Sequence, residues 1–314
     1  MVRYIAKRFL VFLFLFLSAS TVVFFLIRLL PGDPALGVLG DKVQSEDLER
    51  IRGELNGHQP IGYQYLVFLK HTVGFHLGHS LVDGQPVSRL IFVYFPNTLY
   101  LAFLSMALAL LLSLPIGVWV AFKGQRKPLV NAAVTLVGSI GLIPSFVLGP
   151  LLVFFFSIRL GWLPVSGSGD FPHILLPALT LGISMGAFLM PLIRGAVEIE
   201  LEKPYILLAR AKGLSDFRIF KNHVLKNAMI PVLTMMGLQF GSLLAGTVIT
   251  EMIFSWQGIG SLLIGSIHRR DEALIQGIVL FIIFVYMFIH FLIDLSYLFI
   301  DPRIRAGYSD EHHH

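Results

Sequence analysis

The sequence contains no cysteine among its 314 residues. This absence excludes disulfide bonds, thiolate metal sites and cysteine nucleophiles. Charged residues are also scarce, at 14% of the chain, whereas a soluble domain carries about 25%. Hydrophobic residues make up 55% of the chain, and the mean hydropathy is +0.77. The composition therefore predicts a membrane protein with several spans.

The sequence also gives no support for several common classes of enzyme. The sequence holds no GxxxxGK[ST] loop, so we expect no ATP hydrolysis by this chain. Neither a serine nucleophile elbow nor an HExxH zinc helix is expected. The Gly-Ile-Gly stretch at 258–260 follows no predicted strand, which argues against a dinucleotide site. Three histidines could suggest a metal site, but glycines interrupt their helix and a solvated loop is the better interpretation: His71, His76 and His79.

Six segments are long and apolar enough to be membrane spans. A span needs roughly 20 mostly apolar residues, and the segments lie at residues 9–30, 97–122, 129–158, 174–193, 227–249 and 274–300. The first follows a basic start, but its apolar run is longer than that of a signal peptide and no small-residue cleavage site follows it. We therefore expect an all-α fold with six transmembrane helices, the first of them retained.

Lysine and arginine are distributed unevenly between the predicted loops. With the N-terminus in the cytoplasm, fifteen of the 24 basic residues fall on the cytoplasmic side and nine on the other side. Seven of the fifteen lie between Arg194 and Lys226. By the positive-inside rule, both termini are predicted to be cytoplasmic. The net charge of +5 follows this topology and does not indicate a nucleic-acid partner.

The predicted spans divide the chain into four parts. These are the cytoplasmic N-terminus with the first helix (1–30), an extracytoplasmic loop region (31–95), a five-helix core (96–300) and a cytoplasmic tail (301–314). The loop region carries a charged helical stretch from Ser45 to Leu55 and an aromatic stretch from Tyr63 to Phe75. About 60 residues without disulfides form only a marginal core. We expect this region to pack on the spans and to present a surface to an external partner.

A polar, basic segment at 195–226 separates two apolar runs of the core. Such a segment cannot lie in hydrocarbon, so we expect it on the cytoplasmic face, where it can dock to a soluble partner. Pro204 can open a helix at its first position, and Gly213 can adopt a positive φ and reverse the chain. The small Ala209 and Ala211 let a partner surface approach closely. The alternative is an interfacial amphipathic helix held by anionic lipid.

The external hairpin from Glu251 to Asp271 is a second candidate site. Phe254, Trp256 and nearby glycines could form a re-entrant loop that gates the outer mouth of a pathway. Glu251 could contact an external binding protein or the amine of a peptide. The alternative is an aromatic belt at the membrane interface, where tryptophan is common.

Two features inside the spans also need an explanation. His290 and Asp294 share a face of the last helix; local pairing of Asp294 is the preferred interpretation, and a proton relay is the alternative. Prolines and glycines cluster between Pro115 and Pro150. Broken helices in transporters often line a cavity, but kinked packing without substrate contact explains this cluster equally well.

Several motifs together resemble a known family. The segment from Tyr205 to Leu214 reads YILLARAKGL, and HVLKNA follows at 223–228. Further matches are LPGDP at 30–34, PNTL at 96–99, TEMIFSW at 250–256, GIG at 258–260, RRD at 269–271 and DPRIR at 301–305. From end to end the chain is similar to ABC importer permeases, and more narrowly to the dipeptide, oligopeptide and nickel branch.

The chain departs from the family pattern at three places. Leu207-Leu208 stands where the broader coupling motif begins Glu-Ala, and Leu225-Lys226 replaces the terminal Leu-Pro. Gln257 stands where proline often follows Ser-Trp. Coupling itself is still expected. The departures affect which side chains touch the ATPase and how tight the turn at Gln257 is.

The resemblance implies a type I importer architecture in a bacterial inner membrane. The implied partners are a second homologous permease, two cytosolic ATP-binding subunits, an extracytoplasmic solute-binding protein and membrane lipids, with ATP and Mg²⁺ held by the partner subunits and no cofactor or metal bound by this non-catalytic chain. The implied ATPase-coupling residues are Tyr205, Ala209, Arg210, Ala211, Lys212, Gly213, Leu214 and Asp216. The implied external gate or binding-protein contacts are Glu251, Phe254, Trp256, Gly258 and Gly260.

The sequence therefore predicts a permease that supplies half of the pathway of an ATP-driven importer for di- or oligopeptides. The alternative cargo in the same architecture is nickel or a metal chelate. A proton-coupled secondary transporter would need carboxylates along the spans, and only Asp294 offers one. An intramembrane enzyme would need a paired catalytic constellation, which the sequence does not show.

Overall fold

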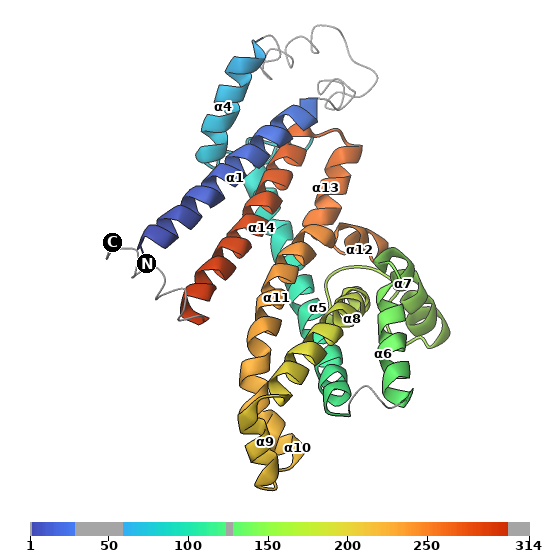
Figure 1. Ribbon diagram of the computed structural model, residues 1–314. Helices are drawn as coiled ribbons and strands as arrows, with labels where there is room; N and C mark the ends of the chain where they lie inside the picture. Colours follow the sequence, from blue (N-terminus) through green and yellow to red (C-terminus); the bar gives the residue numbers. More distant parts are fainter. Residues whose placement is uncertain (1, 29–58, 124–127, 301–314) are drawn as a thin grey trace, which may run out of the picture. The chain divides into compact units, whose positions relative to one another are not determined.

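The computed structural model describes residues 2–28, 59–123 and 128–300 (Figure 1). Within these ranges the chain is helical, apart from turns and one isolated β-bridge between His79 and Pro86. The all-α class predicted from the sequence is confirmed. Three sequence features lie outside the described residues: the LPGDP motif at 30–34, the helix expected from Ser45 to Leu55, and the tail at 301–314.

The helices belong to two compact units. Of the described residues, the first unit holds 2–28, 59–98 and 257–295, and the second holds 99–123, 128–256 and 296–300. The first unit holds α1 (Val2–Arg28), α4 (Ile61–Val73) and α13 (Ile259–His268), with the start of α5 (Val87–Lys123) and most of α14 (Glu272–Ile300). The second unit holds the rest of α5 and α14 together with α6 (Pro128–Gly141), α7 (Ser145–Leu152), the π-helix η1 (Val153–Arg159), α8 (Phe171–Leu201), α9 (Pro204–Ala211), α10 (Asp216–Ile219), the π-helix η2 (Phe220–Val224), α11 (Leu225–Gly246) and α12 (Val248–Ile253).

Six candidate spans match the predicted ones in order. Five helical stretches of the described chain are long and apolar enough to cross a membrane: Ile5–Arg28, Val87–Lys123, Phe171–Leu201, Asp216–Leu244 and Glu272–Leu295. The sixth candidate is a bent pair, Val134–Gly141 and Ser145–Arg159, whose two halves meet at 103°. The span predicted at 129–158 is therefore present as a broken helix.

The break between α6 and α7 follows from the residues at its centre. Pro144 lacks a backbone N–H and disfavours helical geometry at the preceding residue, so it favours a break in the helix here. The Leu142 and Ile143 amides turn back to the carbonyls of Ser139 and Ile140 at 3.2 and 3.1 Å. Pro144 itself has φ −59° and ψ 145°, and its carbonyl accepts the Val147 amide at 2.9 Å to start α7.

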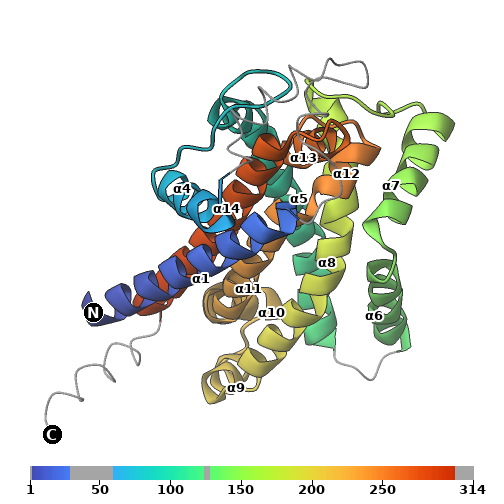
Figure 2. The same cartoon turned by 90° about the horizontal axis from the view of Figure 1, so that it is seen from above.

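In the first unit, α1 and α14 run side by side (Figures 1 and 2). Phe284 lies edge-on to Phe12 at 6.0 Å and to Phe16 at 5.8 Å between ring centroids. Each such contact adds about 1 kcal/mol beyond the area buried. Arg8 Nη1 lies 3.1 Å from Asp294 Oδ2 on the same pair of helices. Asp294 is thus paired, and its partner comes from the basic start of the chain and not from a neighbouring residue of its own helix.

Asp271 anchors the loop before α5 to the start of α14. Its Oδ1 accepts the Leu274 amide at 3.1 Å, the bond of a helix N-cap, and its Oδ2 accepts the Ser80 hydroxyl at 2.5 Å. The Asp271 side chain is fully buried. Beside it, Arg269 pairs with Asp83 at 2.9 Å. These bonds explain why the RRD motif stands at 269–271.

In the second unit, α8 packs against α6, α7 and α11. It also approaches α5 closely, because small residues stand at the crossing. A Cβ on Gly186 would lie 3.2 Å from the Ala109 carbonyl oxygen, and a Cβ on Gly117 would lie 2.9 Å from Cγ2 of Ile193. Close backbone approach at small residues is a main source of helix association in lipid.

We predict that Gly117→Leu pushes α5 away from α8. The new side chain would meet Ile193 and the carbonyl of Met190, and such overpacking costs about 1–3 kcal/mol. The variant should melt at a lower temperature than the wild type in nanodiscs. Gly138→Leu is the matched control, because a Cβ there meets nothing within 4 Å. Equal melting temperatures for the two variants would contradict this packing.

Candidate functional site

The polar segment predicted at 195–226 forms a compact elbow between α8 and α11. We use "elbow" for residues 204–226, which comprise α9, α10, η2, the turn between α9 and α10, and the first two residues of α11. Figure 1 shows α9 and α10 at one end of α8 and α11. Pro204 is the first residue of α9, as the sequence predicted.

Gly213 ends α9 through a Schellman motif. The Leu214 amide donates to the Ala209 carbonyl at 3.2 Å, and the Gly213 amide donates to the Arg210 carbonyl at 2.9 Å. This pair of bonds requires a left-handed residue between helix and turn, and Gly213 has φ +78°. The positive φ predicted for Gly213 is confirmed, and it turns the chain toward α10.

The elbow buries one face and exposes the other. Ile206, Ala209 and Ile219 are buried against the rest of the second unit. Of the eight predicted coupling residues, Ala209 is buried and Leu214 is partly buried. The other six are exposed: Tyr205, Arg210, Ala211, Lys212, Gly213 and Asp216.

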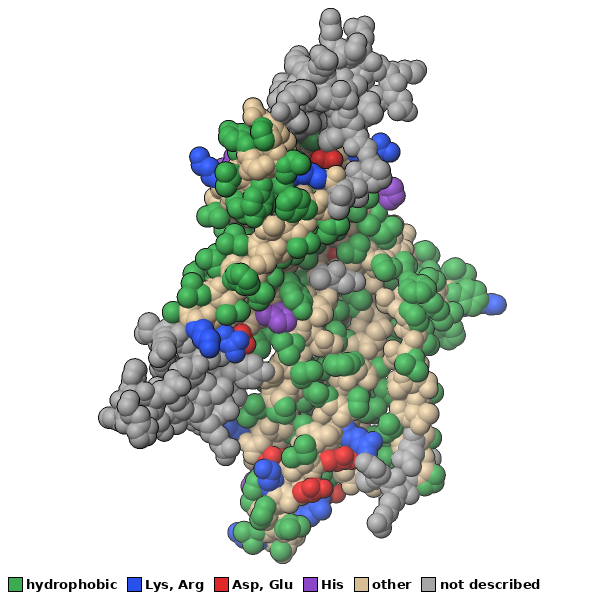
Figure 3. Space-filling view, turned by 45° about the horizontal axis from the view of Figure 1, so that its top comes forward, with side chains coloured by type: hydrophobic (Ala, Val, Ile, Leu, Met, Phe, Trp, Pro, Cys, Tyr) green, Lys and Arg blue, Asp and Glu red, His purple; other side chains and the backbone are tan. Residues whose placement is uncertain are grey.

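Three exposed apolar residues of the elbow were missed by the sequence reasoning. Leu207, Leu208 and Phe217 have 59%, 57% and 72% of their surface exposed. A helical period would have found the first two, because Ile206 and Ala209 mark the inward face and leave the positions between them outward. Arg210, Lys212 and Arg218 are exposed on the same elbow, and Figure 3 shows both basic and acidic side chains at this end. The elbow therefore offers exposed apolar side chains among charged ones.

The residues predicted as an external gate are all buried. Glu251, Phe254 and Trp256 are 0%, 1% and 4% exposed. These three residues belong to the second unit. Gly258 and Gly260 are also buried and belong to the first unit. In this structure none of the five presents a surface to a binding protein. The gate stays a prediction about residues packed inside the chain.

Backbone bonds hold the second-unit part of this hairpin in a tight turn. The Trp256 amide donates to the Glu251 carbonyl at 2.8 Å, and Gly167 donates to the Phe254 carbonyl at 2.8 Å. Between them Ser255 adopts φ +51°. The Thr247 hydroxyl donates to the Glu251 carboxylate at 3.0 Å. The buried carboxylate is thus part of the turn and does not stand open to a ligand.

In the first unit, the start of α5 holds the following turn. Asn97 donates to the Gln257 carbonyl at 2.7 Å, and the Thr98 hydroxyl accepts the Ile259 amide at 2.8 Å. Ile259 is the first residue of α13, so Thr98 supplies a partner to an otherwise unbonded helix-start amide. The PNTL and GIG motifs meet here through Thr98 and Ile259, which are 161 residues apart in the chain. The sequence offered no sign of this pairing.

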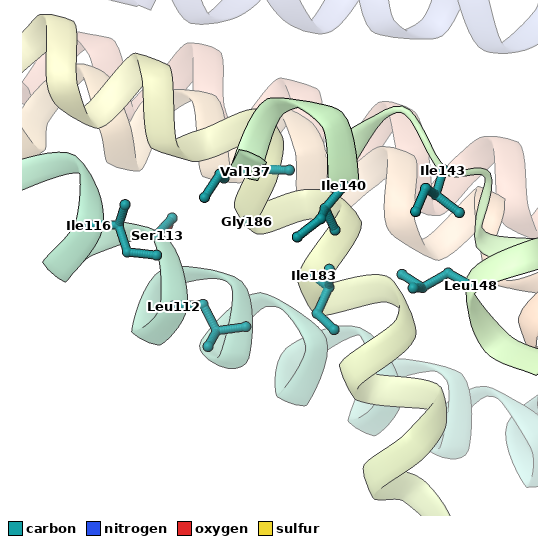
Figure 4. A pocket seen from close by; sticks show the side chains of 10 residues that line it. Leu112, Ser113, Ile116, Val137, Ile140, Ile143, Leu148, Ile183 and Gly186 are labelled. Carbon is teal, nitrogen blue, oxygen red and sulfur yellow. The ribbon is translucent and has the colours of Figure 1, made fainter. Parts of the chain in front are cut away.

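A cavity of about 380 Å³ lies beside the break between α6 and α7 (Figure 4). Ile143 and Leu148 flank the break and line it, as do Ile116 of α5 and Ile183 of α8. Ser113 is the one polar side chain in the lining, and its buried hydroxyl has no hydrogen-bond partner among the described residues. A cavity thus lies beside the broken helix, which is compatible with both interpretations of the proline and glycine cluster. A contact between this cavity and substrate stays a prediction.

Two features that could suggest catalysis or metal binding, the GxSxG spacing and the histidines at 71–79, form no such site in the described structure. The spacing GxSxG occurs at 182–186, but it lies within α8, where Ser184 donates to the Thr180 carbonyl at 3.2 Å. A nucleophile elbow needs a strand–turn–helix, and α8 is continuous. His71 and His76 have ring centroids 6.5 Å apart, but the described residues contain no group of three metal-binding side chains.

Nearly the whole chain matches two protein-family models. Residues 113–306 match the binding-protein-dependent transport system inner membrane component, and residues 1–102 match the N-terminal part of such components. The glutathione transport system permease protein GsiC of Escherichia coli O6:H1 is 37% identical over 305 residues, which is 97% of this chain and 99% of the relative. The GsiC protein of Salmonella choleraesuis has the same identity and coverage.

A solved structure shares the fold. The inward-facing MetNI methionine ABC transporter aligns over 69% of this chain and 98% of the matched chain, with a TM-score of 0.59 and 15% identity. At this identity the likeness concerns the fold alone. It agrees with the helical architecture described above.

Proposed function

Because this chain belongs to the family of binding-protein-dependent transport system inner membrane components, and is thus a permease subunit of an ABC importer, we propose that it imports di- or oligopeptides. The observation that supports this proposal is the end-to-end similarity to permeases named for glutathione transport. Glutathione is a tripeptide, so a peptide-like cargo is the simplest assignment. Nickel or a metal chelate is the competing cargo, and it is included in the test below.

The elbow is the proposed docking surface for an ATP-binding subunit. Protein interfaces place aromatic and aliphatic anchors at a desolvated centre and polar groups at the rim. Phe217, Leu207 and Leu208 provide exposed anchors, and Arg210 and Lys212 lie exposed on the same elbow. The partner would present an apolar groove with an acidic rim.

The proposed assembly follows from this docking. Two ATP-binding subunits hold ATP and Mg²⁺, a second permease completes the pathway, and an external binding protein delivers the cargo. This chain then binds no cofactor and catalyses no reaction. The elbow and both termini lie in the cytoplasm, which is supported by the concentration of basic residues between Arg194 and Lys226. A proton-coupled mechanism has little support, because Asp294 is paired with Arg8.

Reconstitution of the complete complex tests the substrate. The chain is co-expressed with its partner permease, ATP-binding subunits and binding protein, and placed in proteoliposomes. We expect ATP-dependent uptake of glutathione or alanyl-alanine and stimulation of ATP hydrolysis by the same peptide. Uptake of Ni²⁺ alone would overturn the peptide assignment and leave the importer architecture in place.

The orientation has a direct test in the cysteine-free chain. Lys212→Cys introduces a single thiol at an exposed position of the elbow. An impermeant maleimide should label it in inverted membrane vesicles and not in intact spheroplasts. Labelling only from the outside would place the elbow on the wrong face and remove the docking proposal.

Gly213→Pro should uncouple ATP hydrolysis from uptake. Proline has φ near −65° and no N–H, whereas Gly213 has φ +78° and donates to Arg210. The elbow then loses its turn, and uptake per ATP hydrolysed should fall by roughly tenfold or more. Gly195→Ala is the control, because a Cβ there meets nothing within 4 Å and its φ lies outside the left-handed region. Normal coupling in Gly213→Pro would contradict the role of this turn.

A further inference from the structure

Three polar side chains from three helices meet where the elbow joins the spans. Glu200 lies in the last turn of α8, Tyr205 is the second residue of α9, and Asn227 is the third residue of α11. The Tyr205 hydroxyl donates to Oε1 of Glu200. Nδ2 of Asn227 donates to the same carboxylate oxygen at 3.0 Å and to the Tyr205 hydroxyl oxygen at 3.1 Å. We call these three residues the polar triad.

The triad depends on a carboxylate that has no cationic partner among the described residues. Glu200 is only 9% exposed, and the ion pairs of the described chain do not include it. Its charge is therefore stabilised by the two neutral donors, Tyr205 and Asn227. A buried charge that loses a donor is left poorly compensated. Removal of either donor should therefore disturb the position of all three helix ends.

The triad also links the start of the elbow directly to α11 by hydrogen bonds. Two residues, Glu202 and Lys203, connect α8 to α9, so movement of α9 reaches α8 directly. Along the chain, α9 reaches α11 only through α10 and the π-helix η2. Single π-helical turns interrupt regular α-helical bonding and occur frequently at functional sites. The hydrogen bonds from Asn227 to Tyr205 and Glu200 bypass this irregular stretch.

We propose that Glu200, Tyr205 and Asn227 are positioning residues that make α8 and α11 follow the elbow together. The inference rests on the proposed function, in which the elbow docks onto an ATP-binding subunit. Coupling needs an element with two states that both ends can bias. With the triad intact, closure of the ATP-binding subunits moves both spans. Without it, α8 follows the elbow while α11 lags, so ATP is hydrolysed without transport.

Tyr205→Phe is the sharpest test, because it removes only the hydroxyl. Tyr205 is 40% exposed, and its ring lies 6.3 Å from that of His223, so the variant should fold and keep this packing. The complete reconstituted complex is assayed with whichever of glutathione, alanyl-alanine or Ni²⁺ the wild type imports. Assembly and ATP hydrolysis should persist, while uptake per ATP falls by roughly fivefold. Glu200→Gln should act in the same direction.

Glu202→Gln is the matched control. It removes a carboxylate two residues from Glu200, at an exposed position of the connection, and should leave coupling unchanged. A double-mutant cycle of uptake per ATP hydrolysed then tells whether Tyr205 and Asn227 act together or through independent packing effects. If the triad acts as one unit, Tyr205→Phe combined with Asn227→Ala should lose no more coupling than either change alone.

Three results would overturn the proposal. The first is normal uptake per ATP hydrolysed in Tyr205→Phe, and the second is a loss in the double variant equal to the product of the two single losses. The third is a variant complex that loses its ATP-binding subunits to the same extent as it loses uptake. In each case a coupled wild type would leave the proposed function standing. A wild-type complex that imports none of the three cargoes and shows no stimulated ATP hydrolysis would instead remove the proposed function, and this inference with it.

Discussion

Backbone hydrogen bonding inside hydrocarbon is the constraint on which the rest of this structure depends. Lipid supplies no partners for N–H and C=O groups, so an unpaired backbone cannot be exposed there. Three departures from regular helix in the described chain have substitute bonds, and the elbow, which we expect outside hydrocarbon, has them as well as the turns near the spans. The Schellman bonds at Gly213 serve the elbow, Asn97 and Thr98 serve the turn before α13, and Pro144 restarts helix after the break. The irregular segments are therefore specified, and they include the candidate functional sites.

Acidic groups in and near the spans follow a second rule, because an isolated buried charge is costly. Asp294 is paired with Arg8, Asp271 is satisfied by amides and the Ser80 hydroxyl, and Glu251 accepts a bond from Thr247. Glu200 accepts hydrogen bonds from two other helices of its unit, α9 and α11. The contacts of Asp294 and Asp271 join elements of the first unit. The bonds of Glu200 join the elbow to both of its neighbouring long helices, which is the basis of the coupling proposal.

The two candidate sites differ in how they meet their surroundings. The elbow exposes apolar side chains such as Phe217, which suits a surface that docks onto another protein. The hairpin at 251–271 buries Phe254 and Trp256, so a gate at this place, which stays a prediction, would require a rearrangement of packed side chains. A permease that receives its energy from a partner needs both properties, since binding at an exposed surface has effect only if the packed interior has more than one arrangement.

Much of this protein follows from the pattern along the chain. Apolar length determined the spans, basic residues marked the elbow, and a glycine after a helix determined the left-handed turn at Gly213, because each of these depends on neighbouring residues. The tertiary structure alone decided the burial of Glu251 and the 103° angle of the broken span. It also brought Asn227 to Glu200, 27 residues away. Such contacts depend on how helices cross, and helical periodicity records which face is apolar but not which neighbour covers it.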